Sequence, residues 1–204
     1  MKALLHFVGG CCLVGWKIEV DPLFYLTLAC AMLLIPARWL ISWLVAVGVH
    51  ELFHLVAVRL SGTNIYSVCI RSGGASIRTE SMTLGKELIC SVAGPVGSFS
   101  LLLICRCFPL VALCGLVQGA YNLLPLYPLD GGRVLGCLLE MCLPAGTERS
   151  VMLAIRYIVL IVLFVLGLYG FLFTSYGLVS VLLVAVLLVK AIKIPCKSSM
   201  KRVQ

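Results

Sequence analysis

Long apolar segments separated by short polar ones make up most of the chain. They occupy residues 23–35, 39–60, 87–107, 110–126, 151–173 and 176–189. A helix needs about 20 apolar residues to cross a bilayer. The pattern therefore predicts an all-α polytopic membrane protein with about six transmembrane helices, and a shorter apolar helix at residues 134–142.

Two polar intervals alternate apolar and polar residues instead. Residues 64–79 contain two such runs on either side of Ser72, Gly73 and Gly74, and this pattern is typical of a β-hairpin. Residues 16–22 predict a short strand that ends at Pro22. We therefore expect a small β-hairpin or sheet at the cytoplasmic membrane surface, beside the helices.

The composition supports a membrane protein. Apolar residues make up 62% of the 204 residues, charged residues only 12%, and the mean hydropathy is +1.13. Soluble domains have about 45–50% apolar and about 25% charged residues. These values exclude a soluble globular enzyme, a disordered tail and a collagen-like chain.

The net charge of +8 comes from basic residues scattered singly between the apolar segments, which favours an orientation signal over nucleic-acid binding. Six spans place both termini on one side. That side holds Lys2, Lys17, Arg59, Arg71, Arg78, Lys86, Arg133, Arg149, Arg156, Lys190, Lys193, Lys197, Lys201 and Arg202, and the other side holds Arg38 and Arg106. The positive-inside rule then predicts cytoplasmic termini, and it predicts a cytoplasmic catalytic side.

We expect residues 1–204 to form one domain. Its expected parts are an N-terminal strand region at 1–22, a core at 23–142 that includes the hairpin, two C-terminal spans at 151–193 and a basic tail at 194–204.

The segment HELFH, His50 to His54, lies inside an apolar span. Residues i and i+4 share one face of a helix, so His50 and His54 can hold one Zn²⁺ with Glu51 beside it as general base. Two histidines and a glutamate at membrane depth are costly unless they have a function. The segment therefore predicts a zinc-hydrolase site.

A catalytic zinc commonly has three protein ligands, and Asp130 is the better candidate for the third. Pro125 and Pro128 interrupt the helix before it, and Gly131 and Gly132 allow the backbone to turn. Irregular backbone at membrane depth is tolerated where it lines a cavity or is buried. Glu80 lies in a Ser/Thr-rich stretch and is the weaker candidate.

Other interpretations of these residues remain open. The histidines and Glu51 can form a buried polar cluster between helices, and Asp130 can simply cap the next helix. A metal or proton transporter can use the same four residues as a relay, although transporters more often contain repeated halves, which this sequence lacks. A catalytically inactive binding partner is a further alternative, which the intact Glu51 argues against.

HELFH together with NLLPLYPLDGG, residues 122–132, resembles the site-2 protease family of intramembrane zinc metalloproteases. The second segment is similar to the family motif at Asn122, Pro125, Pro128, Asp130 and Gly131, and AGPVGS at residues 93–98 is similar to a small-residue turn of the family. The resemblance implies one Zn²⁺ held by His50, His54 and Asp130, with catalysis by Glu51 and substrate binding at Asn122, Pro125 and Pro128. It also implies an endopeptidase that cleaves membrane-embedded or membrane-associated proteins.

KIEVDPLFYL, residues 17–26, and Arg133 resemble the stage IV sporulation protein FB-like branch of that family. This resemblance implies a bacterial cytoplasmic membrane, a sporulation sigma-factor precursor as substrate, and an inhibitory membrane partner or a homo-oligomer. We expect neither a CBS nor a PDZ domain within the 204 residues.

The hairpin suggests how a substrate binds. An unwound peptide in an apolar setting needs partners for its N–H and C=O groups, and a sheet edge supplies them. We expect the run IYSVCI, residues 65–70, to offer that edge, and the Asn122 amide to bind the substrate backbone.

Overall fold

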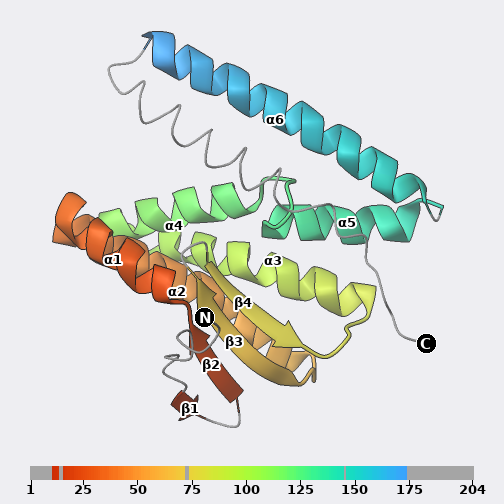
Figure 1. The fold of residues 1–204 in the computed structure, drawn as a ribbon, viewed down its shortest axis with the longest axis horizontal. Helices are drawn as coiled ribbons and strands as arrows, with labels where there is room; N and C mark the ends of the chain where they lie inside the picture. The colour runs from red at the N-terminus through yellow and green to blue at the C-terminus, as the bar shows by residue number, and fades with distance from the viewer. Residues whose placement is uncertain (1–10, 14–15, 72–73, 145, 174–204) are drawn as a thin grey trace, which may run out of the picture. The chain divides into compact units, whose positions relative to one another are not determined.

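The computed structural model describes residues 11–13, 16–71, 74–144 and 146–173. The expected span at 176–189, the basic tail and the expected turn at Ser72 and Gly73 lie outside these residues. The chain divides into two compact units, Met1–Ala120 and Tyr121–Gln204, and Figure 1 draws the elements of both.

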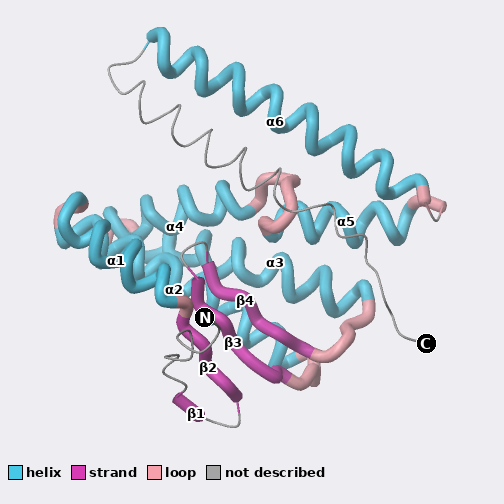
Figure 2. The backbone as a smooth tube through the Cα atoms, in the orientation of Figure 1, coloured by secondary structure: helices cyan, strands magenta, loops and turns pink. Residues whose placement is uncertain are grey.

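The first unit contains a four-stranded sheet with the order β1-β2-β3-β4 (Figure 2). The strands are β1 (Cys11–Leu13), β2 (Trp16–Val20), β3 (Ile65–Arg71) and β4 (Gly74–Thr79). β2 pairs in parallel with β3, and β3 pairs antiparallel with β4. The sequence predicted a strand within residues 16–22 and the hairpin strands, but not the parallel pair that joins them into one sheet.

Four helices and a short 3₁₀ segment complete the first unit, apart from the last two residues of α4. They are α1 (Pro22–Leu34), α2 (Ala37–Leu60), α3 (Leu84–Ser100), η1 (Leu101–Ile104) and α4 (Pro109–Asn122). The Asp21 side chain accepts the Leu23 backbone N–H at 3.0 Å, which caps α1. Pro36 then separates α1 from α2, because a proline disrupts a continuous helix.

The antiparallel helices α2 and α3 form the centre of the first unit. Ala46 of α2 packs with Leu101 and with Cys114 of α4 at one end, and Val58 packs with Cys90 and strand β3 at the other. Small residues bring the two helices close together. A Cβ on Gly97, for instance, would lie 2.5 Å from the Phe53 ring.

The second unit contains α5 (Asp130–Cys142) and α6 (Thr147–Phe173). Its core consists of Leu126 and Leu129, from the loop before α5, packed with Leu160 of α6. The buried loop therefore forms part of the unit's interior and does not simply leave the helices for solvent.

Three of the described helices are long and apolar enough to cross a membrane. They are Ala37–Leu60, Leu84–Ile104 and Thr147–Leu172. The helices α1 and α4, at two other expected spans, have 13 and 14 residues and are shorter than a full crossing requires. The mostly helical membrane fold with a small sheet is confirmed.

Candidate metal and proteolytic site

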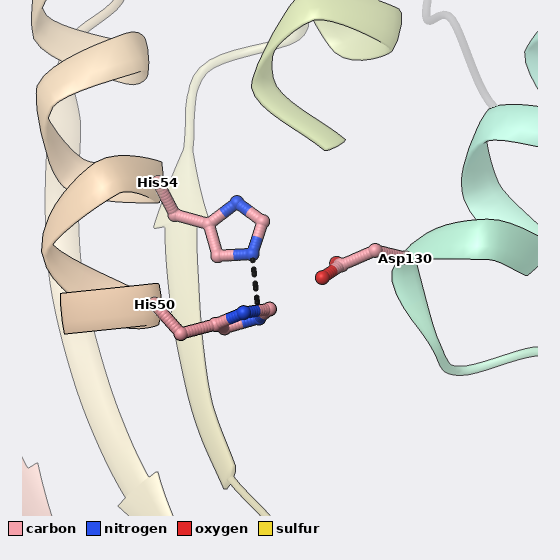
Figure 3. Close-up of side chains that lie close together, drawn as sticks. All are labelled: His50, His54 and Asp130. Carbon is pink, nitrogen blue, oxygen red and sulfur yellow. Dashed lines mark hydrogen bonds between the residues drawn. The ribbon is translucent and has the colours of Figure 1, made fainter. Parts of the chain in front are cut away.

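The two histidines of HELFH face each other inside the first unit. His50 and His54 lie one turn apart on α2 and are 3% and 8% exposed. Their Nε2 atoms are 3.2 Å apart, as the dashed line in Figure 3 marks. The predicted same-face placement of the pair is therefore found in the structure.

Each imidazole is held through its other nitrogen by α3. The Nδ1 atom of His54 lies 2.7 Å from the Cys90 carbonyl oxygen, and Nδ1 of His50 lies 2.8 Å from Ser98 Oγ. A carbonyl can only accept a hydrogen bond, so Nδ1 of His54 is the donor, and in the neutral ring Nε2 then carries the lone pair that a metal needs. Partners of this kind orient the histidine ligands of metal sites.

The spacing of the Nε2 atoms fits one zinc ion. Two nitrogens about 2.0–2.1 Å from a tetrahedral zinc lie about 3.3–3.4 Å apart, close to the 3.2 Å found between His50 and His54. Neutral imidazoles are zinc ligands in many hydrolases. The donor type, the burial and the spacing of this pair all agree with a zinc site.

Gly94 of α3 makes room for the pair. A Cβ at this position would overlap Nε2 of His54 and would lie 2.8 Å from Cε1 of His50. The histidines therefore pack directly against the backbone of α3. Sequence reasoning noted the small-residue segment at 93–98, but did not assign Gly94 or Ser98 to the site.

Glu51 is half-buried on α2, next to His50 in the chain. A Cβ on Gly74 would lie 3.9 Å from its Oε1 atom, so the first residue of β4 is beside the carboxylate. The last strand of the sheet thus begins beside the predicted general base. The sequence did not indicate this contact.

In the second unit, Asp130 is the first residue of α5 and is 8% exposed. The N-terminal end of a helix stabilises a carboxylate. Figure 3 labels Asp130 on α5, together with the two histidines on α2. Asp130 is thus a buried carboxylate at a helix start, whether or not it binds a metal.

Gly131 and Gly132 have a different role from the one expected. Neither has a positive φ angle; among the described glycines, only Gly62, Gly74 and Gly146 do. A Cβ on Gly131 would overlap the Leu123 carbonyl, and one on Gly132 would lie 2.5 Å from the Leu126 carbonyl carbon. These glycines permit close contact between the loop and the first turn of α5, so space and not backbone conformation requires them.

The other predicted residues lie at the ends of elements. Asn122 is the last residue of α4, Pro125 is half-buried, and Pro128 is exposed. Glu80 is exposed, and its Oε2 accepts a hydrogen bond from the Asn64 side chain at 3.2 Å. This surface contact gives Glu80 a structural role that needs no metal.

The fold is that of a site-2 protease. A solved site-2 protease from Methanocaldococcus jannaschii matches with a TM-score of 0.66 and 23% identity, over 95% of this chain and 96% of that chain. Residues 79–166 match the model of peptidase family M50, a range that includes Asp130 but not HELFH. The matched range covers less than half of the 204 residues.

A curated relative is similar to part of the chain. A zinc metalloprotease from Methanocaldococcus jannaschii is 29% identical over 110 residues, which are 47% of this chain and 32% of that protein. The aligned part is thus about a third of the length of that relative. These matches do not favour the transporter alternative.

Proposed function

We propose that this protein is an intramembrane zinc metalloendopeptidase. The observation that carries the proposal is the buried His50–His54 pair, whose Nδ1 atoms are held by α3 and whose Nε2 atoms have a spacing suited to zinc. The match of residues 79–166 to the model of peptidase family M50 and the three apolar helices support the same function.

In this proposal His50, His54 and Asp130 hold one Zn²⁺. All three side chains are buried and each offers one ligand atom, so these three residues would hold the ion. When bound, zinc supplies Lewis acidity that activates water at neutral pH. Glu80 is not part of the proposed ligand set, since it is exposed and bonded to Asn64.

Glu51 acts as the general base and then as the general acid. Its carboxylate takes a proton from the attacking water and passes that proton to the leaving amine of the substrate. Its position next to His50 supports this role, because the helix holds the carboxylate beside the proposed ligands. The Gly74 end of β4 lies beside the same carboxylate.

The substrate binds as an extended strand, but along β4 and not along residues 65–70 as the sequence suggested. β3 is paired on both sides, with β2 and β4, so its backbone groups have partners. β4 is the edge strand next to Glu51 in the described sheet. A peptide added to that edge would therefore reach the proposed general base.

One hydrogen bond identifies which groups of β4 face outward. The Ile70 carbonyl accepts from Asp21 N–H at 2.9 Å, so the backbone N–H and C=O groups of Ile70 point toward β2. The backbone groups of its neighbours Cys69 and Arg71 then point toward β4, where these residues pair with Ser76 and Gly74. Successive residues of a strand alternate in direction, so the N–H and C=O groups of Ala75, Ile77 and Thr79 point toward the open edge.

We further propose that the substrate contacts the loop after α4. Asn122 can bind the substrate backbone with its side-chain amide, and Pro125 and Pro128 keep the following loop from continuing α4. The half-buried position of Asn122 at the end of α4 supports this proposal.

The membrane orientation is also proposed, with the sheet side in the cytoplasm. Arg59, Arg78 and Lys86 are exposed at the sheet end of the α2–α3 pair. Arg38 and Arg106 belong to the opposite end, where Ala46 packs with Leu101. Basic residues are enriched on the cytoplasmic side, which supports this direction.

The proposed substrates are membrane-embedded or membrane-associated proteins, because the candidate site lies within apolar helices. A narrower proposal is a sigma-factor precursor of sporulation. Residues 17–26, which resemble the stage IV sporulation protein FB-like branch, form most of strand β2, the cap residue Asp21 and the start of α1. This resemblance supports the narrower proposal. An inhibitory membrane partner or a homo-oligomer belongs to the same narrower proposal.

Zinc content and cleavage of a co-expressed membrane pro-protein test the proposed site. Glu51→Gln should keep near-stoichiometric zinc and lose cleavage, since the base is lost and the ligands stay. Asp130→Ala should lose most of its zinc, because a ligand is missing. Glu80→Ala is the matched control and should keep zinc and cleavage.

Two results would contradict the proposal. Near-normal cleavage by Glu51→Gln would reject the mechanism. Zinc retained in Asp130→Ala but lost in Glu80→Ala would move the metal site to the end of the hairpin.

A further inference from the structure

Two serines of α3 are fully buried, and they differ in one contact. Ser91 and Ser98 are both 0% exposed, and a spacing of seven residues places them on one face of the helix. Ser98 Oγ lies 2.8 Å from His50 Nδ1, whereas Ser91 Oγ has no hydrogen-bond partner among the described residues. The pair therefore separates the effect of a buried hydroxyl from that of the histidine contact.

The two histidines are held by partners of different kinds. The Cys90 carbonyl can only accept, so it fixes the proton of His54 on Nδ1. The Ser98 hydroxyl can donate or accept, so it is compatible with either neutral tautomer of His50. Only His50 can therefore change tautomer without losing its partner on α3.

Ligation through Nε2 would leave the Nδ1 atom of His50 for the contact with Ser98 Oγ. A metal bound by both Nε2 atoms needs both lone pairs, so the His50 proton would then be on Nδ1 and Ser98 Oγ would accept it.

We infer that Ser98 is a positioning residue that holds the His50 ring so that its Nε2 atom faces Nε2 of His54 and the proposed metal position. This inference rests on the proposed zinc site and assigns to it a residue outside the ligand set and the general base.

Metal affinity of the purified full chain in detergent is the first test, with Zn²⁺ titrated against a competing chelator. Loss of a partner behind a metal ligand typically lowers affinity by about 10–100-fold, so Ser98→Ala should bind Zn²⁺ at least about tenfold more weakly. Ser91→Ala removes an equally buried hydroxyl from the same face and should bind as the unaltered protein does. Equal affinities of the two variants would overturn the inference.

The tautomers themselves can be read without any change at Ser98. The chain has three histidines, so His6→Gln leaves only the pair for ¹⁵N NMR of imidazole nitrogens. With Zn²⁺ bound we expect both histidines to carry their proton on Nδ1, with Ser98 Oγ accepting from His50. A zinc-bound His50 whose Nδ1 carries no proton would overturn the inference.

These readouts are independent of proteolysis. A protein that binds Zn²⁺ and shows the expected tautomers but cleaves no substrate would contradict the proposed activity and leave the role of Ser98 intact. Cleavage with unchanged affinity in Ser98→Ala would do the opposite.

Discussion

Gly94 has no side chain, and the imidazole of His54 occupies the place that a side chain would take. The position cannot relax by moving a flexible end group, because the neighbours are two buried rings held by Cys90 and Ser98. A single methyl group would therefore change the separation or direction of the Nε2 atoms. Metal affinity depends strongly on such positioning.

Gly94→Ala should consequently reduce Zn²⁺ affinity by at least about tenfold, since the ring partners of a metal site control its affinity. Overpacking a buried site also costs about 1–3 kcal/mol, so some loss of thermal stability is expected. Zinc titration and a thermal unfolding assay in detergent measure both effects.

Gly48→Ala is the matched control for that variant. Gly48 also lies in a site helix, two residues before His50, and a Cβ there meets nothing within 4 Å. Unchanged zinc binding is expected for Gly48→Ala, with a small gain in helix stability. Normal zinc binding by Gly94→Ala would mean that the histidines do not need the close approach of α3.

At the scale of the elements, the pairing of the sheet decides where a peptide can add. β3 is interior and β4 is the edge, although the apolar alternation is clearer in β3. Proline is tolerated at a sheet edge when the N–H that it removes points outward. The β4 residues therefore fall into two alternating sets with opposite expected responses to proline.

Ile77→Pro should fold and keep zinc but cleave the substrate more slowly, because the outward N–H at 77 is proposed to bind the substrate. Loss of one backbone hydrogen bond of about 0.5–1.5 kcal/mol corresponds to a roughly two- to tenfold lower kcat/KM. Initial rates on a purified membrane substrate at low concentration measure this value.

Arg78→Pro is the control on the same strand. Its N–H points toward β3, so proline there removes a bond of the β3–β4 ladder and should lower the stability of the protein. Full activity of Ile77→Pro would show that the substrate does not pair with β4.

At the scale of the whole molecule, the membrane orientation connects the charge pattern to the site. Exposed basic residues lie near the sheet end of α2 and α3, namely Arg59, Arg78 and Lys86, and the expected basic tail lies outside the described residues. By the positive-inside rule, the proposed orientation places the sheet and both termini on the cytoplasmic side.

Reporter fusions test this orientation. A reporter inserted between Ser81 and Met82, in the loop before α3, should report a cytoplasmic location, and so should one fused after Gln204. A reporter inserted at Arg106, in the turn between η1 and α4, is the control for the other side of the membrane and should report an external location. An external signal from either of the first two fusions would contradict the proposed orientation.

Local features could be predicted from the sequence because they depend on short spacings. The i, i+4 spacing places His50 and His54 on one face whatever surrounds the helix. The apolar pattern located the helices, and Pro125 and the glycines after Asp130 marked an irregular segment before α5. The role of Asp130 as third ligand stays a prediction, supported by the resemblance and by its burial.

Only the tertiary structure decided how the elements meet. That α3 presents Gly94 and Ser98 to the histidines depends on the contact of two helices about forty residues apart in the chain. That β4 and not β3 is the edge depends on β2, which arrives from before α1. Contacts between distant residues are set by the packing of whole faces, and a single sequence records which residues are small or polar but not which partner they face.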